Sequence, residues 1–486
     1  MLMLPEILVV ATAFAVLVAD LVLSERGRAA LAPLAMAGLA AAAVALGLTP
    51  QAGELLGGRF VMDSVAWWFK ALFLLAGFLT IALSMDLLDG RIGVRARGIG
   101  FRGEYYTMLL VTVSGMMVLI SARDLITLYV SLELATIPLF VLAAWRRDDP
   151  QSGEAGLKYV IIGALASAFI LYGFSILYGL AATTDLAAIG RAISGRPPAA
   201  FWLAAAMVLA GVGFKLTIVP FHLWAADVYQ GAPIPVTAYL SVASKGAGLA
   251  FLFQVFYRLF GTHLQEWGLL VAIFAAVTMT VGNVVAIVQP NIKRFMAFSA
   301  ISQAGYLIMG FLDAAPDKAH GNAGVPAMLF YMLVYILTNL AVFAGIVWYA
   351  NETGREEIKD YRGLSRTNPL MALAIMLGLF SLAGIPPLAG FVGKFFLFKI
   401  ASGAGFHWLV AVAAVNSTIS LYYYLRIVRQ MYIEPTFEGA GPVRASRSLS
   451  ITSAALAVAV VLLGIIPIFY NAVSADTLAW LATLAR

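Results

Sequence analysis

The sequence contains no cysteine, which excludes disulfides, iron–sulfur clusters held by thiolates and thiolate zinc sites. Histidine is scarce as well. The four histidines are scattered and lack H-x-x-x-H or H-E-x-x-H spacing, which argues against a bis-imidazole haem or a zincin site. No G-x-G-x-x-G follows a strand pattern, and no P-loop spacing occurs. Nothing in the sequence therefore points to a site for NAD, a flavin or a nucleotide.

Charged residues are also few, at 12% of the 486 residues, while 62% are hydrophobic. A soluble core cannot bury so much apolar surface, so lipid must surround most of the chain. No long polar block interrupts the sequence, which indicates one continuous membrane domain. In such a protein the net charge of +6 reflects basic loops on one side and gives no indication of nucleic acid.

Apolar segments long enough to cross a hydrocarbon layer of roughly 30 Å predict about fourteen transmembrane helices. They are expected at 4–24, 29–48, 65–88, 105–121, 125–145, 157–180, 201–225, 233–257, 267–288, 295–312, 325–350, 369–401, 406–428 and 450–471. The first segment contains Glu6 and has no basic n-region, so we expect a retained span and no signal peptide. The predicted fold class is an all-α polytopic membrane protein.

The distribution of loop cations predicts the orientation. With the N-terminus outside, the inner loops hold 17 Lys and Arg residues and the outer loops hold 7. This bias follows the positive-inside rule, and one miscounted span in the middle of the chain would spoil it. We therefore expect both termini on the outer side.

A few ionisable residues fall inside the predicted spans. Each charge at mid-bilayer costs on the order of 2.5–3.5 kcal/mol, so Glu133, Lys215, Lys245 and Lys394 should face the protein interior and are candidate functional groups. Lys158 opens its span, where an interfacial role and a functional role are equally compatible with its position. Three further cations lie near span ends, where snorkelling to the interface explains them: Lys70, Lys399 and Arg426.

Two spans carry helix-breaking residues. Pro220 follows Lys215 in GVGFKLTIVPFHLW (211–224), and two prolines precede Lys394 in SLAGIPPLAGFVGKFFLFKI (381–400). Interrupted helices with a nearby ionisable residue, in matching places of two halves, are typical of paired transport sites. The breaks fall in the seventh and twelfth spans, and this odd separation predicts two inverted five-helix repeats.

The expected organisation has four parts. They are three N-terminal helices in 1–104, a first repeat in 105–262, a second inverted repeat in 263–432, and a loop with the last helix in 433–486. Helices 7 and 12 are expected to be discontinuous.

The segment VPFHLWAADVYQGAPIPVTAYLSVASKGAG (219–248) resembles the signature of the antiporter-like subunits of respiratory complex I and of the related multi-subunit Na⁺/H⁺ antiporters. The resemblance covers nearly the whole chain. Four features favour the N-subunit branch of this family. They are the lysine in the broken twelfth span, Lys245 in SVASKGAG, Lys158 in EAGLKYVIIG, and a chain that ends soon after the last span.

The resemblance implies a proton-translocating membrane subunit of NADH:quinone oxidoreductase with no redox chemistry of its own. It implies that Glu133 and Lys215 form an ion pair, that Lys245 is a central relay, that Lys394 is the exit-side group and that Lys158 modulates the pair. Waters and hydroxyls such as those of Ser244 and Tyr239 would connect them.

The resemblance also implies no cofactor in this chain, with flavin, iron–sulfur clusters and quinone in partner subunits. The expected partners are a neighbouring antiporter-like subunit, small membrane subunits and lipids, with no nucleic acid. The expected location is the bacterial inner membrane, with both termini on the periplasmic side.

Two other functions are compatible with parts of the sequence. A subunit of a multi-subunit Na⁺/H⁺ antiporter would share the fold, but the lysine-rich axis with Lys245 argues against it. A purely structural spacer would have no use for buried lysines.

Overall fold

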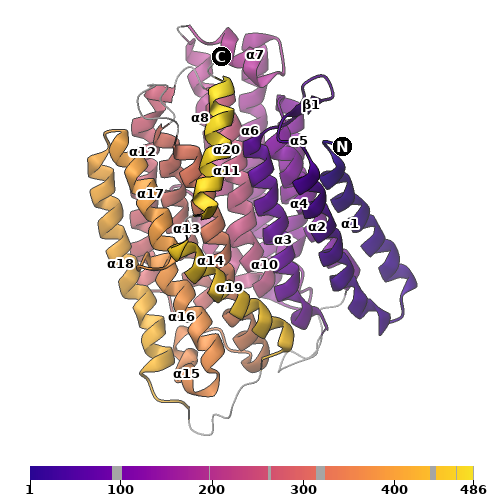
Figure 1. Cartoon of the computed structure of the whole chain (residues 1–486), viewed down its shortest axis with the longest axis vertical. Helices are drawn as coiled ribbons and strands as arrows, with labels where there is room; N and C mark the ends of the chain where they lie inside the picture. Colours follow the sequence, from indigo (N-terminus) through magenta and orange to yellow (C-terminus); the bar gives the residue numbers. More distant parts are fainter. Residues whose placement is uncertain are drawn as a thin grey trace.

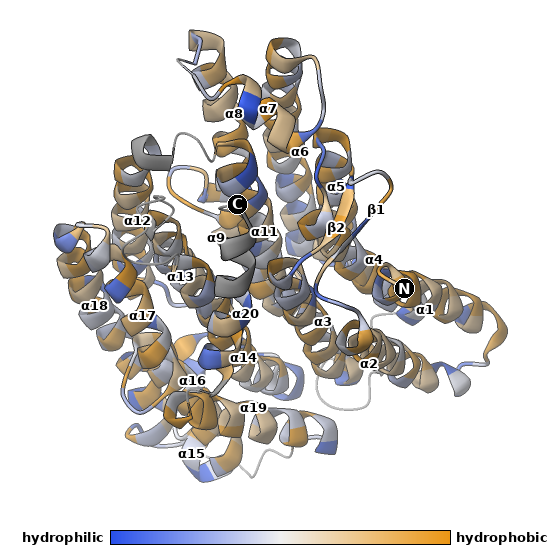
Figure 2. Cartoon of the chain, turned by 45° about the horizontal axis from the view of Figure 1, so that its top comes forward, coloured by the Kyte–Doolittle hydropathy of each residue, from blue (hydrophilic) through white to orange (hydrophobic). Residues whose placement is uncertain are grey.

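The chain forms a bundle of long helices (Figure 1). This computed structural model describes residues 1–89, 101–195, 197–260, 264–313, 323–437, 445–466 and 468–484. Within these ranges, 13 helices are long and apolar enough to cross a membrane. Hydrophobic residues predominate along the helices, and strongly hydrophilic ones lie near α7 and α15 (Figure 2). The predicted all-helical membrane fold is confirmed.

The long helices follow the predicted spans closely. They are α1 (Leu4–Val22), α2 (Leu31–Leu48), α3 (Ser64–Asp89), α4 (Arg102–Ser121), α5 (Leu125–Ala143), α6 (Pro150–Ala181), α8 (Ala199–Leu216), α12 (Leu264–Ile287), α13 (Ile292–Ile308), α14 (Gly324–Thr353), α18 (His407–Tyr432) and α19 (Arg447–Ile465). The eighth span joins α10 (Ile234–Tyr239) and α11 (Lys245–Gln254) through a π-helical turn at Leu240–Ser244, and a second π-helical turn follows at Val255–Leu259.

Both spans that were predicted to be interrupted are broken, whereas α5 continues through Pro138. The seventh span consists of α8 and the short α9 (Leu223–Gly231), separated by the segment around Pro220. The twelfth consists of α16 (Pro369–Ala383) and α17 (Ala389–Gly403), separated by residues 384–388. A proline has no N–H to donate to the carbonyl four residues earlier. The carbonyls of Leu216, Leu382 and Ala383 therefore lose their helical donors, because positions 220, 386 and 387 are prolines.

The two halves of the chain pack in the same order. In the first half, α4 packs against α5 and α6 against α8; in the second, α12 packs against α13 and α14 against α16. This pairing agrees with two five-helix units, although the predicted boundary at 262/263 lies outside the described residues. The central helices α13 and α14 are buried over most of their length, so most of the polar residues they carry lie inside the protein.

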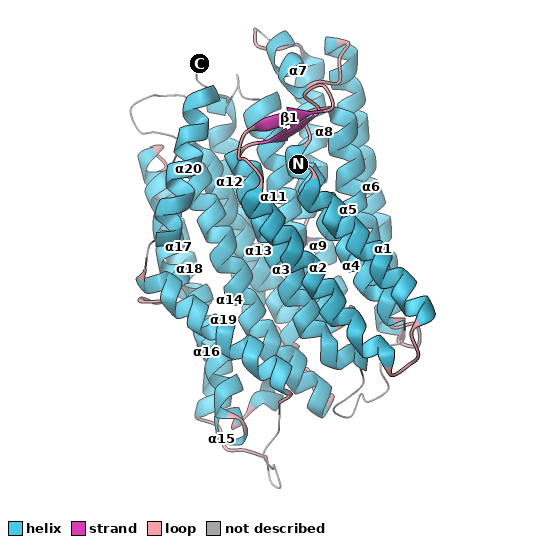
Figure 3. Cartoon of the chain, turned by 45° about the vertical axis from the view of Figure 1, so that its right-hand side comes forward, coloured by secondary structure: helices cyan, strands magenta, loops and turns pink. Residues whose placement is uncertain are grey.

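Some elements were not predicted from the sequence. A β-hairpin of β1 (Gly53–Leu55) and β2 (Phe60–Met62) and a short helix α7 (Leu186–Ala192) lie at one end of the bundle (Figure 3). The short α15 (Leu364–Thr367) lies at the opposite end. The last predicted span, 450–471, is wrong in its end: α19 stops at Ile465, and a further helix, α20 (Ile468–Leu484), follows.

The N-terminus and the end of α20 lie at the same end of the bundle as α7 (Figures 1 and 3). The first residues and the end of α20 thus lie on one side of the bundle. This placement agrees with an even number of membrane crossings, which the predicted orientation requires.

The interpretation of Lys70 as an interfacial side chain is wrong. Its side chain is fully buried, and its Nζ lies 2.6 Å from Glu6 Oε1 of α1 and 4.6 Å from the centre of the Phe60 ring. The partner was missed because Glu6 is remote in the sequence. Arg426 also has a definite partner, since its guanidinium donates to the carbonyls of Ile287 and Gln289 at the end of α12. Lys399 is exposed, as expected.

We predict that Glu6→Leu or Lys70→Met alone destabilises the protein by about 3–5 kcal/mol, because each leaves a buried charge without its partner. The double variant should recover most of this loss, since a buried ion pair is often replaceable by apolar side chains. The measurement is the loss of folded protein on heating in detergent. A double variant as unstable as the worse single variant would contradict the pairing.

Candidate functional site

The first buried amine lies at the end of α8, where Pro220 stops the helix. Lys215 is 3% exposed, and its Nζ lies 5.8 Å from the centre of the Phe140 ring and 5.5 Å from that of Phe214. Among the described residues, no atom hydrogen-bonds to this nitrogen. A buried cation without a hydrogen bond is costly. The charged form of Lys215 therefore needs an acid or a water nearby to stabilise it.

Glu133 lies on α5, on the wall of a cavity of about 900 Å³ that Phe140 also lines. Its carboxylate accepts a hydrogen bond of 2.5 Å from the Ser167 hydroxyl of α6. The expected direct ion pair with Lys215 is not formed between the described side chains. Phe140 instead lies beside both groups, since it lines the cavity with Glu133 and its ring centre is 5.8 Å from Lys215 Nζ.

The central amine belongs to Lys245, which directly follows the π-helical turn of the eighth span. Lys245 is 1% exposed, and its Nζ donates a 2.8 Å hydrogen bond to Thr217 Oγ1. Turns of this kind occur often at functional sites, because they alter the direction of side chains within a helix. The two hydroxyls expected beside it have other partners. Ser244 lies 3.5 Å from the Lys215 carbonyl, and Tyr239 lies 2.6 Å from Thr112 Oγ1.

The third amine lies beside the second break. Lys394 is 3% exposed, and its Nζ donates to the Ala383 carbonyl and to Ser417 Oγ, each at 3.1 Å. The Ala383 carbonyl is one of those that a proline deprives of its helical donor. The lysine also lies 4.5 Å from the centre of the Tyr306 ring. The carbonyl freed by the break and the buried amine are therefore hydrogen-bond partners of each other.

A hydrogen-bonded group connects this break to the centre of the bundle. Gln303 of α13 donates at 3.2 Å to the Leu382 carbonyl, the second carbonyl that lost its donor, and accepts from the Tyr331 hydroxyl of α14. One turn along α14, Tyr335 donates at 3.0 Å to the Ser241 carbonyl in the turn that precedes Lys245. Buried polar residues thus extend from the second amine towards the third.

Lys158 lies at a polar surface outside the buried file. Its side chain is 40% exposed and lies 2.7 Å from both Asp227 and Glu154. Asp227, on α9, also accepts at 2.5 Å from Arg294 of α13. One carboxylate thus accepts hydrogen bonds from two cations on different helices. Lys158, Glu154 and Asp227 line a small opening of about 170 Å³.

Lys293, which lies in the stretch after α12, pairs with Glu356 at 3.0 Å and is 3% exposed. This ion pair joins α13 to the segment after α14. The same nitrogen lies 3.5 Å from the Ala232 carbonyl, so Lys293 has structural partners at this position.

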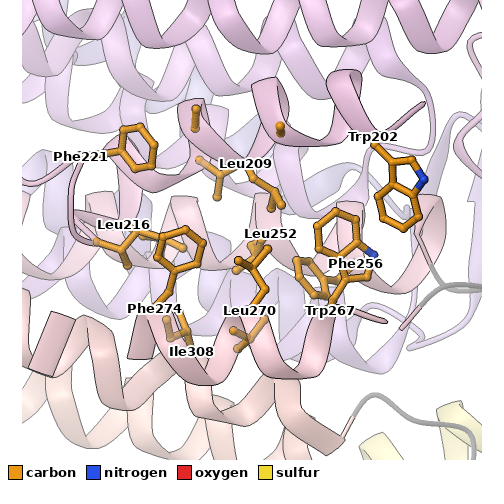
Figure 4. A pocket seen from close by; sticks show the side chains of 15 residues that line it. Trp202, Leu209, Leu216, Phe221, Leu252, Phe256, Trp267, Leu270, Phe274 and Ile308 are labelled. Carbon is orange, nitrogen blue, oxygen red and sulfur yellow. The ribbon is translucent and has the colours of Figure 1, made fainter. Parts of the chain in front are cut away.

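An apolar cavity of about 310 Å³ lies on another side of the first break (Figure 4). Leu216 and Phe221 line it from the break, and Leu252, Phe274 and Ile308 line it from α11, α12 and α13. Among the described residues, no charged side chain lines this cavity. The end of α8 therefore lies beside an apolar cavity.

Sequence reasoning found the three amines and the acid but missed their partners. The sequence did not identify the side chains that bind these groups or Lys158, or the one that caps the second break: Thr217, Asp227, Gln303 and Ser417. The usable signal was the proline: each proline identifies a carbonyl four residues earlier that needs a new donor. The identity of that donor depends on the tertiary fold.

Comparison with known proteins places this architecture among respiratory and antiporter membrane subunits. Residues 122–420 match the family described as NADH:quinone oxidoreductase/Mrp antiporter. The chain is 41% identical over 464 residues to the NADH-quinone oxidoreductase subunit N of Moorella thermoacetica, an alignment that covers 95% of this chain and 94% of that protein.

Solved structures show the same similarity. A chain of respiratory complex I from Thermus thermophilus superimposes with a TM-score of 0.79 at 31% identity, covering 96% of this chain and 97% of that one. A chain of the Mrp complex from a Dietzia species superimposes with a TM-score of 0.82 at 22% identity, covering 98% and 97%. The second similarity shows a shared fold alone.

We predict that Gln303→Leu destabilises the protein by about 2 kcal/mol or more, because the Leu382 carbonyl and the Tyr331 hydroxyl each lose a buried partner. The measurement is the midpoint of thermal unfolding in detergent. Gln289→Leu is the matched control, since among the described residues that half-buried amide donates only to the Val285 carbonyl at the end of the preceding helix α12. Equal midpoints for the two variants would contradict the bridging role of Gln303.

Proposed function

This chain belongs to the NADH-quinone oxidoreductase subunit N family, and we propose that it moves protons along a buried file of Glu133, Lys215, Lys245 and Lys394. As a member of that family it is a membrane subunit of NADH:quinone oxidoreductase that translocates protons. The observation that carries the residue assignment is the burial of all three amines: each is at most 3% exposed and lies beside a helix break or a π-helical turn.

In this proposal, Glu133 controls the proton on Lys215. A desolvated amine keeps its proton only while a carboxylate is close, and releases it when the carboxylate withdraws. The broken α8–α9 span, with an apolar cavity beside it, permits the small movement required. The proton then passes to Lys245 and, through the polar residues around Tyr331 and Gln303, to Lys394.

Transfer against a membrane potential of 100 mV requires about 2.3 kcal/mol per proton. We propose that this free energy comes from redox chemistry in partner subunits. The chain has no cysteine and thus no thiolate ligands for an iron–sulfur cluster, which supports a non-redox role for this subunit and the location of flavin, clusters and quinone elsewhere.

The two transport units correspond, in this proposal, to residues 105–262 and 263–432. Lys215 would serve the first unit, Lys394 the second, and Lys245 would join them. Lys158, with Asp227 and Arg294, would form a charged entrance that modulates the first unit. The shared acid between Lys158 of α6 and Arg294 of α13 supports this role, because it links the two units at one surface.

The face of α5 and α6 that carries the Glu133 cavity is the proposed contact with a neighbouring membrane subunit. Ile137 and Leu157 are 53% and 62% exposed beside the acid. An apolar face with one carboxylate complements a membrane helix that brings a hydrogen-bond donor. The partners in this proposal are another antiporter-like subunit and small membrane subunits, with lipid over the remaining surface.

We place the chain in the bacterial inner membrane with both termini on the periplasmic side. The excess of basic residues in the opposite loops supports this orientation. The location of the N-terminus and of the end of α20 at one end of the bundle agrees with it.

We predict that Lys215→Ala leaves the complex assembled but abolishes most of its redox-driven proton pumping, because the first amine of the file is lost. The measurement is the pH gradient formed by membrane vesicles on oxidation of NADH, normalised to the amount of assembled complex. Lys399→Ala is the control, since Lys399 is exposed and lies outside the file. Normal pumping by assembled Lys215→Ala complex would refute the assignment.

The alternative function, a subunit of a Na⁺/H⁺ antiporter, rests on the shared fold. We predict that the chain, purified with a tag under mild conditions, brings subunits that contain flavin and iron–sulfur clusters. The measurement is the absorption spectrum and subunit composition of the purified complex. Co-purification of hydrophobic subunits alone, with no flavin or cluster absorption, would favour the antiporter.

A further inference from the structure

Thr217 follows α8 at the first break and lies against the central amine. Its side chain is 1% exposed. Its Oγ1 accepts the 2.8 Å hydrogen bond from Lys245 Nζ and lies 2.5 Å from the Leu216 carbonyl. That carbonyl is the one that Pro220 leaves without a helical donor. A single hydroxyl therefore joins the broken end of α8 to the lysine of the next span.

The backbone of Thr217 is unusual for its residue type. Its φ of +59° lies in the left-handed region, where a helix commonly ends in glycine and where a β-branched residue is a clear outlier. Such strained positions are associated with functional sites. Glycine would adopt this conformation freely but would bring no hydroxyl. The hydroxyl is therefore what threonine provides at this position and glycine, which the backbone conformation favours, would not.

We propose that Thr217 is a relay hydroxyl of the proton path, an assignment that rests on the proposed roles of Lys215 and Lys245. When Lys245 is an ammonium, its N–H donates to Oγ1, and the hydroxyl donates to the Leu216 carbonyl. When Lys245 is a neutral amine, the hydroxyl turns to donate to the nitrogen lone pair. A proton then reaches Lys245 as the hydroxyl proton, a water on the Lys215 side replaces it on Oγ1, and the Lys215 ammonium returns a proton to that water.

This arrangement gives both protonation states of Lys245 a hydrogen bond. A hydroxyl is suited to the task because it both donates and accepts. The position also links the relay to the break, since Thr217 is two residues from Lys215. Movement of the end of α8 therefore changes the geometry at Lys245 directly.

The test compares Thr217→Val, Thr217→Ala and Thr217→Ser in the intact complex. Valine keeps the shape and removes the hydroxyl, alanine removes both, and serine restores the hydroxyl. We expect pumping, normalised to assembled complex, to fall about tenfold or more in the valine and alanine variants, the scale of a lost hydrogen bond to a charged group. Serine should keep most of the activity.

The pH profile of pumping separates a relay from a structural role. Without Oγ1 the ammonium form of Lys245 loses its acceptor, so the alkaline limb of the profile should move to lower pH in Thr217→Val and return in Thr217→Ser. Thr80→Val is the matched control, since Thr80 is fully buried and its hydroxyl donates only to Ala76 within α3. It should alter neither the rate nor the profile.

The lysine variants distinguish the two levels of the proposal. Normal pumping in both Lys215→Ala and Lys245→Ala would overturn the proton path itself. Impaired lysine variants with a normal rate and profile in Thr217→Val would overturn the role of Thr217 alone. Should the valine variant fail to assemble, the alanine variant decides the same question.

Discussion

Every backbone carbonyl within a membrane must find a donor, and this requirement governs how the chain places its charges. A helix satisfies its carbonyls internally, but a proline removes one donor and exposes one acceptor. In the second half of the chain, the Ala383 carbonyl accepts directly from Lys394. In the first half, the Leu216 carbonyl is served by Thr217, which in turn accepts from Lys245. The carbonyls freed at the breaks accept hydrogen bonds, directly or through Thr217, from the buried amines. Each group thereby gains a partner that the membrane interior would not provide.

The same constraint accounts for the composition of the central helices. α13 and α14 are buried over most of their length, so their glutamine, asparagine and tyrosine side chains find hydrogen-bond partners inside the protein. Gln303 uses its amide on both sides, donating to one helix and accepting from another. The polar interior is therefore a set of specific pairs, most of which join different helices.

The membrane spans and their two interruptions could be predicted because their causes are local. An apolar run shows its length in the sequence, and a proline shows which helical donor is missing. The acid and the three amines were recognisable for the same reason, since an ionisable residue within an apolar run is conspicuous. The partners were not recognisable, because Thr217 and Lys245 are 28 residues apart and Gln303 and Leu382 are 79 apart. Lys70 was misinterpreted for this reason: its acid lies on another helix. The π-helical turn at Leu240–Ser244 leaves no mark in the hydrophobic pattern, and the hairpin strands are too short to show a periodicity.

The cavity beside α8 is lined by hydrocarbon and aromatic rings, and it adjoins the point where the helix is interrupted. Side chains that line a cavity have few van der Waals contacts on that side. They can therefore shift with only a small loss of packing energy. A cavity lined by polar groups would also allow movement, but it would bind water. Ions could then leak across the membrane through that water. An apolar cavity allows the end of α8 to move. Because it offers ions no polar ligands, it gives them no route that bypasses the buried amines.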